Sequence, residues 1–338
     1  MEQPQGEQAD LMNDLSTRYL GLNLKNPLIV GSCGFTNSVD KIKNLADSGA
    51  AAVVLKSLFE EQIQAEYSAN VESYTADYPG ATEYIREYTR GAEVDQYLKL
   101  IGGAKKAVAI PVIASINCVS ATEWVAFAKS VEQAGADAIE LNISLLPSNP
   151  RLTATDYERR YVEIINKIKD LVAIPLTLKM SSYSASLANL IQELSKIDKV
   201  AGFVLFNRYY TPDIDIEKMT LTTAEILSSP AEGCNALRWI ALMSGRIEKD
   251  LVASAGIHDG AGVIKQILAG AAAVQVVSTV YKNGAARLAT MLDELDSWMT
   301  RKSYANLAQF RGQLSYEKAG NPAVFERTQF MKYYGGLS

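Results

Sequence analysis

Short apolar runs alternate with amphipathic stretches along almost the whole chain. Apolar, β-rich runs predict eight strands, at 27–32, 51–56, 111–116, 137–142, 174–179, 201–206, 251–255 and 273–277. Stretches with helical periodicity lie between and after them, at 38–47, 93–108, 121–134, 154–171, 184–197, 232–247, 260–269 and 282–301. Strands that are apolar on both faces and are each followed by a helix are typical of a buried parallel sheet. Eight such units predict an α/β protein with a single-domain (β/α)₈ barrel of the TIM type.

A short phrase occurs three times and supports this organisation. It joins the end of a helix to a strand through a glycine and a few small or acidic residues, in DSGAAAVVLK, QAGADAIELN and LAGAAAVQVV. Gly49, Gly135 and Gly270 occupy the position where a helix often ends with a residue at positive φ. The strand follows at once, so the phrase predicts tight connections between helices and strands. Open α/β sheets use the same connection, so the phrase alone does not distinguish them from a barrel.

Two loops and the two ends of the chain stand outside the regular alternation. We predict a polar N-terminal tail over 1–15, the barrel over 16–301 and a C-terminal extension over 302–338 that packs on the barrel or on a partner subunit. The segments 57–92 and 207–231 are long connections after the second and sixth strands. Long loops in a compact domain are usually functional lids or walls.

Composition and charge exclude several classes of function. The formal net charge of −5 and the scattered basic residues give no basic stripe, so nucleic acid is not expected as a partner. Cys33, Cys118 and Cys234 are far apart, which argues against a disulfide framework and against a metal site built on cysteines. The single histidine, His258, excludes a multi-histidine metal site. With no apolar run long enough for a membrane span and no signal-peptide pattern, we expect a cytoplasmic protein without a membrane partner.

Five of the predicted strands end in one lysine or asparagine: Lys56, Asn117, Asn142, Lys179 and Asn207. A polar residue at the end of a buried strand does nothing for a hydrophobic core. The carboxyl ends of the strands in a (β/α)₈ barrel meet at one mouth, where active sites lie. The five side chains therefore predict the position of the site together with the fold.

The chemistry of these side chains leaves several interpretations open. A lysine at a buried strand end can be the charge partner of an electron-rich ring, a Schiff-base nucleophile, a phosphate contact or a member of a salt bridge inside the barrel. The asparagines offer paired donors and acceptors that suit a flat heterocycle, or they can bond to neighbouring loops.

The last two strands carry the strongest local motif. SAGIHDG follows the seventh strand and VVST follows the eighth, and both open a helix. Barrels often bind phosphate at these two loops, because free N–H groups and the helix dipole favour an anion. Gly256 would let the backbone approach closely, while Ser278 and Thr279 could add hydroxyl donors. The alternative is ordinary capping of the two helices by Asp259 and Ser278.

Several segments of the chain together resemble a known family. LSTRYLGLNLKNPLIVGSCGF, VLKS, ELNIS, PLTLKM, LFN, SAGIHDG and QVVSTVYKNG occur in the order and approximate spacing of the dihydroorotate dehydrogenases. The resemblance covers about 16–315. It implies an FMN-containing (β/α)₈ barrel that oxidises dihydroorotate to orotate in pyrimidine synthesis. The cytosolic class, which has no membrane-binding N-terminal helix, is the nearest in length.

Carried over by position, the resemblance implies a set of cofactor contacts. The residues implied along or near the flavin ring are Ser32, Cys33, Gly34, Lys56, Ser57, Asn117, Asn142 and Lys179. Lys179 would sit by the N1–O2 edge and stabilise the reduced flavin anion. Gly256, Ser278 and Thr279 would hold the FMN phosphate.

The substrate side departs from the family pattern. The family's N-x-S-C-P-N or N-x-S-S-P-N loop has its catalytic base at the fourth position, where this chain has Leu145. Asn142, Asn207 and Arg208 remain as predicted substrate contacts, and Lys56, Lys179 and Ser144 as predicted catalytic residues. The family's N-S-x-G-x-x-N segment is missing after the second strand, where this chain has YTADYPGATEY.

These observations favour an FMN-dependent oxidoreductase that transfers a hydride from a small, anionic substrate to flavin N5, and that assembles as a homodimer. Flavin-side positions match the family better than orotate-side positions, so the substrate need not be dihydroorotate. One alternative is a flavin-free lyase or aldolase that uses Lys179 as a Schiff-base amine. Another is a flavin-binding protein without turnover.

Overall fold

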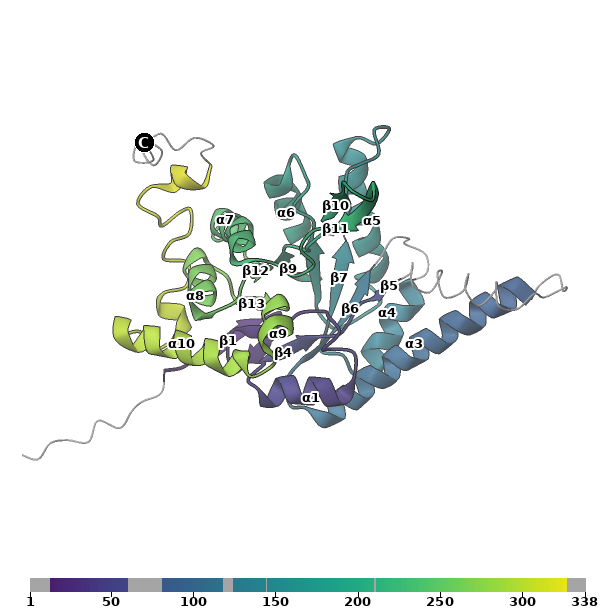
Figure 1. Ribbon diagram of the computed structural model, residues 1–338, viewed down its shortest axis with the longest axis horizontal. Coiled ribbons are helices and arrows are strands. Elements are labelled where there is room, and N and C mark those ends of the chain that lie inside the picture. The colour runs from purple at the N-terminus through teal and green to yellow at the C-terminus, as the bar shows by residue number, and fades with distance from the viewer. Residues whose placement is uncertain (1–12, 60–80, 118–123, 144, 210, 327–338) are drawn as a thin grey trace, which may run out of the picture.

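Eight parallel strands close into a barrel. The computed structural model describes residues 13–59, 81–117, 124–143, 145–209 and 211–326 (Figure 1). The barrel strands are β3 (Leu28–Val30), β4 (Ala52–Val54), β6 (Val112–Asn117), β7 (Ala138–Ile143), β8 (Leu176–Met180), β9 (Val200–Leu205), β12 (Asp250–Ser254) and β13 (Ala273–Val276). They pair in the order β4-β3-β13-β12-β9-β8-β7-β6, and a pairing of β4 with β6 closes the ring. A short strand, β5 (Leu58–Phe59), pairs with the end of β6. The predicted barrel and all eight predicted strands are confirmed.

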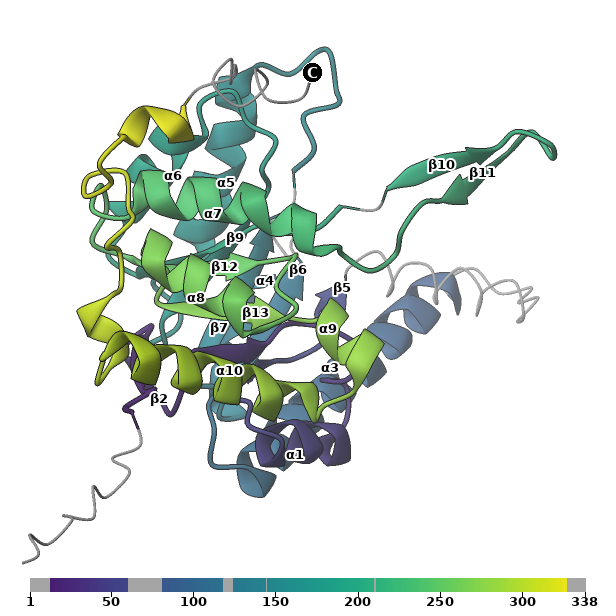
Figure 2. The ribbon, with the colours of Figure 1, turned by 60° about the vertical axis from the view of Figure 1, so that its left-hand side comes forward.

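Helices cover the outside of the barrel (Figures 1 and 2). They are α1 (Val39–Asp47), α3 (Ala81–Ala107), α4 (Trp124–Gln133), α5 (Ala154–Ile168), α6 (Leu187–Ser195), α7 (Gly233–Met243), α8 (Gly260–Ala269), α9 (Ser278–Asn283) and α10 (Arg287–Lys302). The predicted helix over 282–301 is wrong in one respect, because the chain forms α9 and α10 with a break between them. Gly284 lies at the break with φ of 77°. Likewise α3 begins at Ala81, inside the segment that we expected to be a loop.

Two hydrophobic layers hold the barrel together. The larger layer lies between the strands and the helices, and includes Val30, Val53 and Val112. The smaller layer fills the barrel interior and includes Ile29, Val54, Ile113, Ala138, Val204 and Val252. Because side chains alternate across each strand, neighbouring residues such as Val53 and Val54 belong to different layers.

An N-terminal hairpin plugs the amino end of the barrel. Its strands are β1 (Thr17–Tyr19) and β2 (Leu22–Leu24), and Tyr19, Leu20 and Leu24 pack with the interior layer. The Leu20 amide donates to Asp250 Oδ2 at 2.7 Å, which fixes the hairpin to the start of β12. With this end filled, the described residues leave the carboxyl end of the barrel open to a ligand.

The glycines of the repeated phrase adopt the predicted backbone. Gly49, Gly135 and Gly270 have φ of 110°, 97° and 123°. At Gly270 an added Cβ would lie 2.0 Å from Ser244 Oγ, so both the backbone angle and the packing require glycine there.

Beyond the barrel, the long connection after β9 forms a hairpin. Its strands, β10 (Pro212–Asp215) and β11 (Thr220–Thr223), project from the barrel body (Figure 2). A 3₁₀ turn, η1 (Pro230–Glu232), then leads into α7. No helix in the described ranges has both the length and the apolar character that a bilayer crossing needs.

The start of the C-terminal extension lies on the barrel. Backbone bonds of 2.9 Å join Gly312 to Ile267 and Leu314 to Leu268, at the end of α8. Leu307 and Phe310 are buried in the outer layer. The extension includes two 3₁₀ turns, η2 (Leu307–Gln309) and η3 (Pro322–Phe325). Residues 327–338 and 1–12 lie outside the described residues.

Candidate active site at the carboxyl end of the barrel

Three of the predicted polar residues lie side by side across neighbouring strands. Asn117 pairs with Asn142, and Asn142 pairs with Lys179, in the register of β6, β7 and β8. Paired positions on neighbouring strands direct their side chains to the same face of a sheet. Asn142 and Lys179 are both buried. The row therefore forms part of the floor of the mouth.

A cavity of about 1000 Å³ opens above Lys179, whereas Asn117 and Asn142 are not among the residues that line it. Seven of the predicted site residues line it: Ser32, Cys33, Lys179, Asn207, Arg208, Gly256 and Ser278. A second cavity of about 300 Å³ shares Asn207 and Arg208 with the first and adds Tyr183, Tyr209 and Thr211. The volumes are those of small-molecule sites. Of the five predicted strand-end residues, Lys179 and Asn207 line this cavity.

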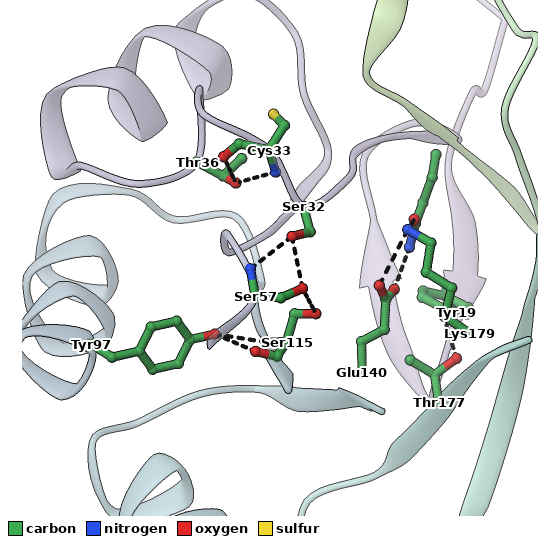
Figure 3. A network of polar contacts seen from close by, with 11 residues as sticks. Tyr19, Ser32, Cys33, Thr36, Ser57, Tyr97, Ser115, Glu140, Thr177 and Lys179 are labelled. Carbon is green, nitrogen blue, oxygen red and sulfur yellow. Dashed lines mark hydrogen bonds and ion pairs between the residues drawn. The ribbon is translucent and has the colours of Figure 1, made fainter. Parts of the chain in front are cut away.

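The cavity wall at β3 is held by a chain of hydroxyl groups (Figure 3). Ser32 Oγ lies 3.0 Å from Ser57 Oγ, which lies 2.7 Å from Ser115 Oγ. The Ser57 amide also donates to Ser32 Oγ at 2.8 Å. These bonds fix the turn after β3, so that Ser32 and Cys33 face the cavity. Ser57 and Ser115 are buried, which makes Ser57 a support of the wall rather than part of its surface.

Other residues of this wall differ in accessibility. Burial raises the pKa of the Cys33 thiol, so Cys33 is neutral at physiological pH and is not an activated thiolate. The Gly34 amide donates to Tyr281 Oη at 2.8 Å, and an added Cβ at Gly34 would lie 2.7 Å from that oxygen.

Lys56 has an exposed side chain and is absent from the residues that line the two cavities. Ser144 lies outside the described residues.

The opposite end of the cavity is built by the loops after β12 and β13. Gly256 has φ of 73°, and an added Cβ would lie 2.1 Å from the Gly233 nitrogen. Its amide donates to Ser228 Oγ at 3.2 Å, and the Ser228 amide donates to Ser278 Oγ at 2.9 Å. Lys282 Nζ donates to the Ser228 carbonyl at 3.0 Å. Ser228 and Lys282, which the sequence motif did not identify, thus join this end of the site.

Thr279 and His258, from the loops after β13 and β12, bond to protein groups at this end of the cavity. Thr279 is buried, and its hydroxyl donates to the His258 carbonyl at 3.1 Å, so only its backbone remains for a ligand. His258 Nε2 lies 3.3 Å from Ser228 Oγ. Burial, with the Lys282 charge, lowers the pKa of His258 below 6.5, so the ring is neutral near pH 7. Lys282 is therefore the cation at this end of the cavity.

Arg208 is held by the loop around it. Its guanidinium donates from Nε to Glu232 at 2.7 Å and from the two terminal nitrogens to the carbonyls of Ile226 and Glu225, at 2.7 and 2.8 Å. These bonds close the segment between the projecting hairpin and α7. The side chain lines both cavities, but most of its donor capacity serves the loop. Substrate binding by Arg208 stays a prediction.

Lys179 rests on a buried carboxylate. Its Nζ lies 3.5 Å from Glu140 Oε1 and donates to Gln275 Oε1 at 3.0 Å. Its position is therefore compatible with two of the interpretations given above, a salt bridge inside the barrel and a ligand contact. Sequence reasoning missed Glu140 and Gln275. The available signal was a charged or amide side chain within two otherwise apolar strands, AIELN and AVQVV.

An apolar pocket of about 190 Å³ lies beside the segment that follows β7. Leu145, Tyr161 and Tyr183 are among the side chains that line it. Leu145 packs on the outer hydrophobic layer. Burial raises the pKa of Tyr161, so its hydroxyl is protonated at neutral pH. Glu158 also lines the pocket and accepts a hydrogen bond from Ser186. Position 145 itself supplies no group that can take a proton.

Comparison with known proteins shows the family of this chain. A sequence model of dihydroorotate dehydrogenase matches residues 14–299. The chain is 27% identical over 321 residues to the catalytic subunit of dihydroorotate dehydrogenase B (NAD(+)) from Thermoplasma volcanium, covering 89% of this chain and 98% of the relative. It is 26% identical to the subunits of the same name from Thermoplasma acidophilum and Methanosarcina acetivorans, over 89% and 88% of this chain and 99% and 94% of the relatives. Because the match spans the barrel from its plug to its last helix, the chain belongs to the dihydroorotate dehydrogenase family.

Proposed function

We propose that this chain binds FMN in the 1000 Å³ cavity and oxidises a small, anionic substrate that need not be dihydroorotate. As a member of its family, the chain is a flavin-dependent oxidoreductase that acts on CH–CH groups. The observation that carries the more specific proposal is the polarity of the cavity. One end has the Lys179 ammonium, and the other has hydroxyls, backbone amides and Lys282. Bound there, the flavin would accept a hydride from the substrate.

The donor set fits the two ends of FMN. Lys179, Asn117 and Asn142 would hold the polar edge of the ring, because they offer a positive charge and amide groups at one level of the barrel. Ser32 and Cys33 would form the wall beside the ring. At the other end Gly256, Ser228 and Ser278 would hold the phosphate with backbone and hydroxyl groups, and Lys282 would supply a positive charge.

The alternative of a Schiff-base lyase fits less well. Such chemistry needs a neutral amine that can attack a carbonyl carbon. The Lys179 nitrogen lies 3.5 Å from Glu140 Oε1 and donates to Gln275 Oε1 at 3.0 Å, so it is held by two partners inside the barrel rather than presented to a carbonyl carbon. A flavin-binding protein without turnover remains an alternative. Bleaching of the flavin band by a substrate under anaerobic conditions would support the oxidoreductase, and its absence across a screen of small carboxylic acids would favour the alternative.

FMN, rather than FAD, is the expected cofactor. The cavity has one phosphate-type end, and the chain has no GxGxxG dinucleotide fingerprint. We expect that the flavin released from the denatured protein elutes with FMN in chromatography. Protein stripped of its flavin and offered FMN and FAD in equal excess should take up FMN. Recovery of FAD, or no uptake of FMN, would contradict the assignment.

The projecting hairpin supports our proposal of a homodimer. Ile214 pairs with Leu221, so both side chains lie on one face of the hairpin, and Ile216 and Met219 lie in the turn at its tip. These four side chains are 62%, 81%, 78% and 87% exposed, respectively. The other face carries aspartates and threonines. A strongly apolar face on a projecting element is typical of a protein–protein contact, and we infer that a second copy of this chain covers it.

Charged substitutions on this face are expected to separate the dimer. Burying one large apolar side chain contributes about 1.5–3 kcal/mol, so the double variant Ile214→Lys, Leu221→Lys should weaken dimerisation by at least ~10²-fold. Light scattering coupled to size exclusion would measure the mass. Thr220→Lys adds a charge to the opposite face and should leave the mass unchanged. A monomeric wild-type protein, or a double variant with unchanged mass, would contradict this proposal.

A further inference from the structure

Glu140 is a buried carboxylate inside the barrel. Its exposed fraction is 0%, and it lies in the middle of β7. In the described part of the chain, its one ion-pair partner is Lys179, at 3.5 Å from Oε1. Oε1 makes no hydrogen bond there. A buried charge is costly unless it is paired, so the carboxylate depends on Lys179.

Gln275 connects the same two residues. Its Nε2 donates to Glu140 Oε2 at 2.5 Å, and its Oε1 accepts from Lys179 Nζ at 3.0 Å. A carboxylate can only accept, so Glu140 fixes the Gln275 amide with its nitrogen toward β7. The amide oxygen must then face Lys179. Glu140 therefore acts on the ammonium twice, directly through charge and indirectly through the orientation of Gln275.

Glu140 lies one layer below the cavity floor. In the strand register it is level with Ser115 and Thr177, two residues before the row of Asn117, Asn142 and Lys179. Lys179 and Gln275 line the cavity, whereas Glu140 does not. Figure 3 shows the Lys179 side chain directed toward the Glu140 carboxylate. A ligand in the cavity would thus contact the lysine, while the carboxylate would act from below.

We propose that Glu140 and Gln275 are positioning residues that hold Lys179 and balance its charge, and thereby set the reduction potential of the cofactor. The inference rests on the proposed flavin site. Because a positive charge near the ring stabilises the anionic reduced form, a counter-charge behind the lysine lowers that stabilisation. Removing the counter-charge leaves the ammonium uncompensated and favours the reduced form.

The test is the midpoint potential of the flavin-loaded protein, measured against a reference dye. Glu140→Gln keeps the shape and removes the charge, and we expect it to shift the equilibrium toward reduced flavin by about tenfold, a rise of ~30 mV for a two-electron couple. Glu163→Gln removes one charge from an exposed position on α5 and should leave the potential unchanged. A shift below about threefold for Glu140→Gln, or a fall in potential, would overturn the proposal.

Two further measurements keep the test decisive. If Glu140→Gln does not fold, Glu140→Asp is measured instead; it keeps the charge but draws it away from Lys179, and it must have a higher potential than the wild type. Melting of the flavin-free protein tests the pairing without any cofactor. Glu140→Gln and Lys179→Met should each melt at least about 5 °C lower than the wild type. The double variant Glu140→Gln, Lys179→Met should melt at a temperature that recovers at least half of the larger of these two losses. Additive losses would overturn the pairing, whereas a wild-type protein that binds no flavin would overturn the proposed function, and with it the effect on the potential, but would leave the pairing of Glu140 with Lys179 standing.

Discussion

Lys179→Met is expected to lower the midpoint potential of the bound flavin by about 60–90 mV. Removal of one preorganised charged or polar group at a developing charge typically costs ~10²–10³-fold, and each tenfold step equals about 30 mV for a two-electron couple. Lys179 is the cation on the floor of the cavity and is only 7% exposed, so water would replace its charge poorly. Methionine fills a similar volume without the charge. Potentiometric titration of the flavin-loaded variant measures the effect.

The structure adds a cost in stability that the sequence did not suggest. Without Lys179 the Glu140 carboxylate is buried and unpaired, and breaking a buried pair in this way typically costs about 3–5 kcal/mol. The potential must therefore be compared at a temperature where both proteins are folded. Lys167→Met removes a charge from an exposed site on α5 and should change neither property. An unchanged potential in Lys179→Met would remove Lys179 from its proposed role.

The barrel and the convergence of its strand ends could be predicted from local pattern. Each strand is a short apolar run with a tight connection before it, and this pattern is typical of a parallel strand that is buried on both faces. A polar residue near the carboxyl end of such a strand can face the barrel mouth or the outside, and Lys56, which is exposed and lines neither cavity, shows that the pattern alone does not decide between them. Asn117, Asn142 and Lys179 do share one register level, as their common place at the ends of neighbouring strands predicted.

The partners of these residues could not be predicted in the same way. Lys179 contacts Glu140 and Gln275, which lie 39 and 96 positions away in the sequence. Nothing in a single strand indicates which other strands carry the matching side chains at the same height. Arg208 shows the same limit, because its bonds to Glu232 and to two backbone carbonyls depend on how the loop closes. The amphipathic hairpin at 212–223 was likewise hidden within a long connection.

Dihydroorotate is expected to be a poor substrate. Proton transfer by a placed base typically contributes ~10²–10⁴-fold, and the position of the family's base is occupied by Leu145, which packs on the hydrophobic layer. Tyr161 in the same pocket is held protonated by burial, and Glu158 accepts a bond from Ser186. The chain also lacks the family's N-S-x-G-x-x-N segment, which should weaken binding of the orotate ring. Turnover should therefore fall well below the usual enzyme range of about 1–10³ s⁻¹.

Steady-state assays with dihydroorotate and with fumarate, a quinone or NAD⁺ as acceptor would measure this turnover. Leu145→Cys supplies a group that can take a proton, but we expect it to leave the rate low, because the asparagine set on the substrate side is incomplete. Leu146→Cys, at an exposed neighbouring position, is the matched control. A wild-type rate within the usual range would show that another group serves as the base. Recovery of that rate in Leu145→Cys alone would show that dihydroorotate already binds in a productive position, and that the missing base is the one defect of the site.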